Sequence, residues 1–532
     1  YKKEFIGTPI FDLISRLEVS SIEQKFPKLK RPREHKNEFG EKLIDLTNIF
    51  TIDFNSDFDE FKAAKMFYLS GMFDYVEVQV LPNLMYVPDD PKLISQYHLD
   101  LINAVEAWDL QKGDTNVVIG IIDTGIDTDH PEVIGRVKHN YDDPIDGIDN
   151  DNDGYVDNFS GWDTGSKDND PEVWGDHGNQ VTGCASINTD NASDVAAIGF
   201  NTMILPVKIS NDSGFLIGAY DGIVYAANHG ADIINCSWGA PSSFSQFQQD
   251  VINYATNNKG AIVVAAAGND NSNSYFYPAS YDNVVSVGGT DENDKKWISS
   301  SSTGSQFNDA IDVVAPAQNI VSIWKGGGSG LIGRGTSFAA PIVSGVLGLI
   351  KAEYPSASPQ KLCAILKAST DDIYGVAGNE GYLKKLGTGR VNAFKALQPV
   401  STPFLTYYNH KTDDGSNQNL AAGDTVLISV DIKNHLAATN NVSIILRSLD
   451  TYTTVLDSIS FVSSIGNEEI KTSEVYFKFV IGNLVGLNSS AQFSLFMTDG
   501  QNDFSDAFSI KVNKDYVDIT TNNLDLSFNN YG

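Results

Sequence analysis

The sequence has few cysteines and no long apolar run. Its 532 residues include 3 cysteines, Cys184, Cys236 and Cys363, and none has the spacing of a CxxC metal or redox site. Three cysteines cannot build a disulfide framework, so each is expected to be a small buried apolar residue. No stretch of about eighteen uninterrupted apolar residues occurs, so no membrane-spanning segment is expected.

Positive charge is also scarce. Lys and Arg total 37 against 68 Asp and Glu, which gives a formal net charge of -31. A surface of this sign repels phosphate groups, so neither nucleic acid nor an anionic membrane is expected as a partner. The acidity suits calcium binding and a salty or extracellular setting; the alternative is that it only keeps a large surface soluble.

The length predicts two to four domains. Residues 1–42 form an N-terminal extension without a motif. Residues 43–86 show strand, helix and strand patterns in an order typical of a small α+β module. A turn-rich linker at 87–98 follows. The first residue is Tyr1 rather than Met, so we expect an upstream segment, such as a signal peptide, to be missing from this numbering.

The hydrophobic pattern divides the remaining chain into three parts. From 99 to 398, short apolar strands alternate with helices, which predicts an α/β domain with a mainly parallel sheet and helices on both faces. Residues 399–514 contain alternating segments divided by turn residues, which predicts an antiparallel β-sandwich. The polar tail at 515–532 is interpreted as a linker.

Two segments could hold a paired acid and base. Asp123 ends an apolar strand at a turn with Gly125, where backbone groups can hold its carboxylate. His177 and Gly178 open a predicted helix. Each signal is weak alone, because Asp-Thr-Gly also surrounds aspartic-protease aspartates, an Asp at a strand end is often a cap, and most histidines are not catalytic.

Two further segments could hold a nucleophile and an oxyanion donor. Ser337 begins a predicted helix, where peptide dipoles favour negative charge, although a helix-capping serine is the alternative. Asn269 follows Ala265, Ala266, Ala267 and Gly268 at a strand end. Its amide can donate to an oxyanion, and the small residues before it leave space for a substrate side chain.

The four segments follow one another in the order Asp, His, Asn, Ser, and in this the chain resembles the subtilisin-like serine proteases (subtilases, peptidase S8) over residues 99–397. The resemblance implies a serine endopeptidase that acts on proteins or peptides through an acyl-enzyme. It assigns as catalytic Asp123, His177, Ser337 and Asn269. It assigns as substrate-binding Ser237, Trp238, Gly239, Ala266, Ala267 and Gly268.

Some positions depart from the pattern of the family. Asn179 and Gln180 follow the His-Gly pair, and Arg334 and Phe338 flank the serine motif. None of these removes a catalytic group, but Arg334 and Trp238 leave the specificity open. The main alternative is a binding or adhesion protein on an inactive protease scaffold. It is disfavoured because such a scaffold has no chemical need for all four catalytic groups.

An acidic segment predicts a structural Ca²⁺ ion and no organic cofactor. Carboxylates alternate from Asp149 and a glycine follows, as in the first half of an EF-hand loop, but Ser160 stands where the closing Glu is expected. The predicted ligands are Asp149, Asp151, Asp153, Tyr155 through its carbonyl, and Asp157. The alternative is a solvated acidic turn.

The resemblance also bears on the two ends of the chain. It implies that residues 43–86 are a prodomain that inhibits its own enzyme and is removed by autoprocessing near Met85 or Tyr86; a permanent N-terminal domain is the alternative. Secretion or a cell-surface location is expected. For the sandwich, carbohydrate or protein binding, attachment to a surface, and plain stabilisation all stay open.

Overall fold

The structure is a computed structural model that describes residues 8, 10–36, 38–55, 58–79, 86–415 and 419–514. The chain divides into two compact units, Tyr1–Leu84 and Met85–Gly532. The predicted tail at 515–532 and Met85 of the predicted processing site lie outside the described residues. None of the helices described here combines the length and the apolar character that crossing a bilayer requires.

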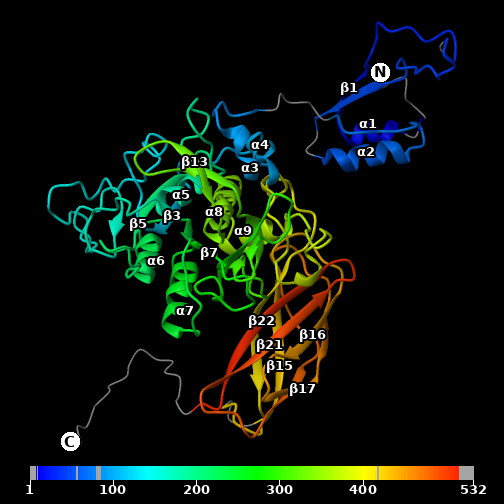
Figure 1. The fold of residues 1–532 in the computed structure, drawn as a ribbon. Helices are drawn as coiled ribbons and strands as arrows, with labels where there is room; N and C mark the ends of the chain where they lie inside the picture. Colours follow the sequence, from blue (N-terminus) through cyan, green and yellow to red (C-terminus); the bar gives the residue numbers. More distant parts are fainter. Residues whose placement is uncertain are drawn as a thin grey trace, which may run out of the picture. The chain divides into compact units, whose positions relative to one another are not determined.

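The first unit is small and of the predicted α+β type (Figure 1). Its elements are α1 (Phe11–Arg16), β1 (Val19–Gln24), β2 (Phe50–Phe54) and α2 (Glu60–Leu69). The two strands pair antiparallel, and Asp59 caps α2 by accepting a hydrogen bond from the Lys62 N–H at 2.7 Å. Ile14, from the expected extension at 1–42, and Phe67, from the expected module at 43–86, share one buried cluster. The second strand pattern of residues 43–86 falls at 75–80; no strand is formed over 75–79, and Val80 lies outside the described residues.

A seven-stranded parallel sheet forms the centre of the second unit. Its strands, in spatial order, are β11 (Val313–Pro316), β8 (Val284–Thr290), β7 (Ile262–Ala266), β6 (Ile233–Cys236), β3 (Val118–Asp123), β5 (Met203–Lys208) and β4 (Trp162–Asp163). All six neighbouring pairs are parallel. Strand β3 lies between β5 and β6, so the strands that follow it in the sequence are added on both of its sides. Ligands bind parallel sheets at such a reversal of strand order, beyond the carboxyl ends of the strands.

Helices cover both faces of this sheet, as predicted (Figure 1). Ile119 and Ile121 of β3 pack in the cluster that includes α5 (His177–Ala185) and α8 (Thr336–Glu353). Val118 and Ile122 pack in the other, with α6 (Ala219–Asn228) and α7 (Gln246–Asn253). Because side chains alternate across a strand, the Val and Ile residues of β3 contribute to both cores.

Shorter elements complete this domain. The helical ones are η2 (Leu93–Ser95), α3 (Tyr97–Leu101), α4 (Ala104–Trp108), η3 (Tyr254–Asn258), α9 (Pro359–Ala368), η4 (Glu380–Tyr382) and α10 (Ala393–Ala396). The strands are β9 (Ile298–Ser300), β10 (Thr303–Gly304), β12 (Ile320–Ile323) and β13 (Ser329–Gly333). They pair as two antiparallel hairpins outside the main sheet.

The C-terminal part contains two antiparallel sheets, which confirms the predicted sandwich. One holds β14 (Leu405–Asp413), β15 (Thr425–Asn434), β20 (Phe477–Ile481), β17 (Thr453–Asp457) and β19 (Ile470–Thr472). The other holds β18 (Ile459–Val462), β16 (Val442–Ser448), β21 (Ser489–Thr498) and β22 (Asp503–Val512). Ile428 and Phe479 of the first sheet share one buried core with Ile444 and Leu495 of the second.

Candidate active site

An acid and a histidine meet at the end of β3. Asp123 is the last residue of β3 and is 2% exposed, and His177 is the first residue of α5. His177 Nδ1 lies 2.8 Å from Asp123 Oδ1, which also accepts the Thr124 N–H at 2.7 Å. The carboxylate therefore fixes the orientation of the imidazole.

Two glycines, Gly125 and Gly178, allow the turn after β3 and the start of α5 to come close together. A Cβ on Gly178 would lie 1.8 Å from the Gly125 carbonyl oxygen, and one on Gly125 would lie 2.6 Å from the Glu172 oxygen. The turn after β3 and the first turn of α5 are therefore in direct backbone contact.

The electrostatics favour a basic imidazole. Burial lowers the pKa of His177, but the charge of Asp123 and its hydrogen bond act in the opposite direction and outweigh burial. The pKa of His177 is raised above 6.5 as a result.

The serine and the asparagine lie beside this pair. Ser337 is in the first turn of α8, and Asn269 follows the end of β7. Asn269 Oδ1 accepts the Thr336 N–H at 2.9 Å. Within the described part of the chain, the Ser337 hydroxyl donates its hydrogen bond to the Ser237 carbonyl, at 3.2 Å, rather than to His177.

All four side chains line one cavity of about 360 Å³. Five of the six residues predicted to bind substrate line it too, namely Ser237, Trp238, Gly239, Ala266 and Gly268. Ala267 is not among the lining residues, and it packs in a core cluster with Ile311 and Val314. Lining residues that the sequence did not indicate as substrate-binding are Thr124, Gly214, Leu216, Phe276 and Thr336. Of these, only Thr124 and Thr336 are neighbours of predicted catalytic residues.

The acidic segment brings together a different set of carboxylates from the predicted one. Among the described residues, carboxylate oxygens of Asp143, Asp149 and Asp151 lie within 4.8 Å of one another. Asp143, which sequence reasoning missed, is fully buried and accepts the N–H groups of Asn150 and Asn158 at 2.8 and 3.0 Å. A hard cation suits three such oxygens.

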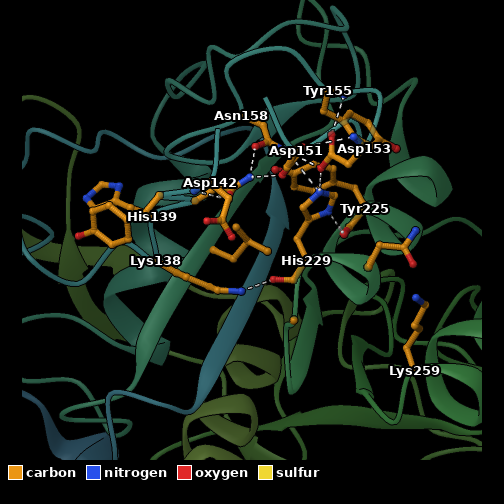
Figure 2. A pocket seen from close by; sticks show the side chains of 15 residues that line it. Lys138, His139, Asp142, Asp151, Asp153, Tyr155, Asn158, Tyr225, His229 and Lys259 are labelled. Atoms are coloured by element: carbon orange, nitrogen blue, oxygen red, sulfur yellow. Dashed lines mark hydrogen bonds and ion pairs between the residues drawn. The ribbon is translucent and has the colours of Figure 1, made fainter. Parts of the chain in front are cut away.

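The other predicted ligands have protein partners. Asp153 Oδ2 lies 2.6 Å from His229 Nε2 (Figure 2), and Asp157 accepts the N–H groups of Asp146 and Gly147. The Tyr155 ring packs against Trp162 and Tyr225. These contacts join the two ends of the segment to each other and to α6.

A second place could hold a cation. Asp90 and Glu132 are 4% and 1% exposed, and burial raises the pKa of both carboxyls. Asp90 Oδ1 and Glu132 Oε1 are buried and have no hydrogen-bond partner among the described residues. Their charges also act on one another, so a bound cation would compensate both. The two positions are far apart in the sequence, which gave no signal for this pair.

Comparisons with known proteins identify relatives over this domain. Residues 114–393, more than half of the chain, match the subtilase family (Peptidase_S8). Thermitase of Thermoactinomyces vulgaris is 35% identical over 316 residues, which cover 59% of this chain and 100% of thermitase. The thermophilic serine proteinase of Bacillus sp. strain AK1 is 34% identical over 329 residues, 61% of this chain and 73% of that protein. A solved protease of Pseudoalteromonas arctica PAMC 21717 is 28% identical, with a TM-score of 0.49, and the match covers 59% of this chain and 99% of that one.

Proposed function

Because the chain belongs to the subtilase family and is a serine endopeptidase, we propose that Asp123, His177 and Ser337 are its catalytic triad, with Asn269 as an oxyanion donor. One observation carries this proposal. The 2.8 Å contact between Asp123 and His177 lies in the wall of the cavity that Ser337 and Asn269 also line.

The chemistry follows from the groups present. His177 removes the proton from the Ser337 hydroxyl as the oxygen attacks a peptide carbonyl, and Asp123 stabilises the imidazolium that forms. The Asn269 amide and the Ser337 N–H hold the oxyanion. His177 then gives its proton to the leaving amine, and water hydrolyses the acyl-enzyme.

One hydrogen bond must change during this cycle. In the structure the Ser337 hydroxyl donates to the Ser237 carbonyl, and the proposal requires it to donate to His177 instead. Catalytic hydrogen bonds often align only when substrate binds.

Labelling with a fluorophosphonate probe, followed by peptide mapping, tests the nucleophile. The protein is processed first, so that residues 1–86 are removed, and wild type is compared with Ser337→Ala. Label on Ser337 in wild type alone is the expected result. A folded, processed wild type that takes no label on Ser337 would contradict the assignment and favour an inactive scaffold that only binds.

We also propose that residues 43–86 belong to an inhibitory prodomain and that the enzyme matures by autoprocessing near Met85 or Tyr86. The compact unit that ends at Leu84, directly before this point, supports it. N-terminal sequencing of wild type and Ser337→Ala provides the test. Wild type should lose the segment and the variant should keep it. Active enzyme that still begins at Tyr1 would refute autoprocessing.

Calcium is proposed as a structural ion. Asp143, Asp149 and Asp151 would hold one ion, with Asp153, Tyr155 and Asp157 closing the segment around it; Asp90 and Glu132 would hold another. Bound Ca²⁺ would neutralise neighbouring carboxylates and take no part in peptide cleavage. Calorimetric titration of the chelated protein should show uptake, and a flat titration would refute both sites.

The acidic composition supports secretion or a cell-surface location, which we propose for this enzyme, with the C-terminal sheets as a candidate attachment module. Fractionation of the producing cells, with and without residues 399–514, tests both parts. The intact protein should be found outside the cell or on its surface, and the truncated protein in the medium.

A further inference from the structure

Phe276 lies between two chain segments that line the active-site cavity. A Cβ on Gly239 would lie 2.5 Å from Phe276 Cε1, and a Cβ on Gly268 would lie 2.9 Å from Phe276 Cγ. The ring therefore contacts both glycines, one on each segment. It occupies the space that small residues were expected to leave open for a substrate side chain.

The backbone holds the ring in this position. Tyr277 and Ala240 exchange two backbone hydrogen bonds, of 3.0 and 2.9 Å, so the chain next to Phe276 is joined to one wall of the space. The Phe276 N–H donates to Ser280 Oγ at 3.1 Å. A side chain on a backbone fixed at both sides is placed with little freedom.

The same two segments adjoin the catalytic groups. Ser237, two residues before Gly239, donates through Oγ to the Ser337 carbonyl at 2.8 Å, and Asn269 directly follows Gly268. An oxyanion held by Asn269 belongs to the residue that supplies the acyl group of the scissile bond. The side chain of that residue starts at the carbon bonded to the reacting carbonyl, so it enters between these segments.

We propose that Phe276 closes this pocket and restricts the acyl-side residue of the substrate to small side chains such as Gly, Ala or Ser. The proposal rests on the proposed triad and adds to it a substrate class. A large side chain would have to displace a ring that is packed on both sides, whereas Ala needs little room beyond its Cβ.

Peptides that differ only in the acyl-side residue (Gly, Ala, Leu or Phe) test this in the processed enzyme. Wild type should favour Ala over Phe in kcat/KM by at least about 10-fold, the lower end of what a single methylene contributes in an apolar pocket. Phe276→Ala should raise kcat/KM for the Phe peptide relative to kcat/KM for the Ala peptide by a similar factor. Phe276→Leu should lie between the two.

Tyr275→Ala is the matched control. Tyr275 is the aromatic residue next to Phe276 and is 49% exposed, and its hydroxyl donates a hydrogen bond to Asp309 at 2.9 Å. Its replacement should leave the ratio of kcat/KM for Ala to kcat/KM for Phe unchanged. Labelling of Ser337 is measured on every sample. If wild type labels but cleaves after Phe as readily as after Ala, the inference is overturned and the triad stands. If wild type fails to label, the triad itself fails.

Discussion

Asn269 Oδ1 accepts two hydrogen bonds from Thr336, one from its backbone N–H at 2.9 Å and one from its hydroxyl at 3.0 Å. The same hydroxyl accepts the Gly268 N–H at 3.2 Å. These hydrogen bonds fix the orientation of the Asn269 side chain, which lines the cavity. Thr336 is therefore a positioning residue for the proposed oxyanion donor.

Replacing these two residues should have unequal effects. Asn269→Ala should lower kcat by about 10²–10³-fold, the loss measured for this type of donor in subtilisin, with little change in KM. Thr336→Val should lower kcat less, because the backbone donor stays. Steady-state kinetics on one peptide provide the measurement. In the Asn269→Ala background, Thr336→Val should cost almost nothing further, and a full additional loss would contradict a positioning role.

Activity should fall on the acid side at a pH above 6.5. The raised pKa of His177 means that the imidazole is protonated below it and cannot accept the serine proton. Asp123→Asn should shift this limb of the kcat/KM profile to lower pH and reduce kcat by about 10⁴-fold. Asp212→Asn removes the same charge from an exposed position and should change neither quantity. An acid limb that stays in place in Asp123→Asn would refute the pairing.

Chelation should destabilise the protein. A ligand that binds only the folded state adds about 2.7 kcal/mol when its concentration is one hundred times its Kd. Thermal unfolding of wild type should therefore shift upward with added Ca²⁺. Asp143→Asn should reduce the calcium-dependent part of this shift, and Asp142→Asn, an exposed neighbour, should not. An equal shift in both variants would remove Asp143 from the ligand set.

A buried histidine should make the enzyme sensitive to acid. His98 is 1% exposed, and burial lowers its pKa from 6.5 to about 3. The folded state thus binds fewer protons than the unfolded state between these values, so its contribution is complete above pH 6.5 and is lost as the pH falls toward 3. Between pH 6.5 and 5 the loss is about 2 kcal/mol.

Urea unfolding at several pH values measures this loss. His98→Gln should unfold with a shallower pH dependence than wild type below pH 6.5. His35→Gln, at an exposed position, should follow wild type. If the His98 variant keeps the slope of wild type, another group is responsible.

The fold and the proposed triad could be predicted because their signals are local. Short apolar strands alternating with helices indicated the parallel sheet, and Asp123 and His177 stand directly at a strand end and a helix start. Ala267 differs from Ala266 because residues alternate across an extended chain: Ala267 packs with Ile311 and Val314, whereas Ala266 lines the cavity.

The site residues that the sequence did not predict are brought into place by contacts between distant segments. Phe276 enters the cavity from a loop whose course no periodicity describes. Asp143 precedes the alternating carboxylates and joins Asp149 and Asp151 only after the segment folds back. The charges of Asp90 and Glu132 act on one another only once the domain has folded.

The contact between Gly125 and Gly178 limits how this enzyme can evolve. No side chain stands between Asp123 and His177 that a mutation could enlarge, shrink or exchange, so the spacing of the pair has no gradual route of change. A library covering every substitution should tolerate many residues at Gln180 and almost none at these two glycines. Adaptation to new substrates is thereby directed to the rim of the cavity, where Leu216 and Phe276 can vary while the acid and base stay at a fixed separation.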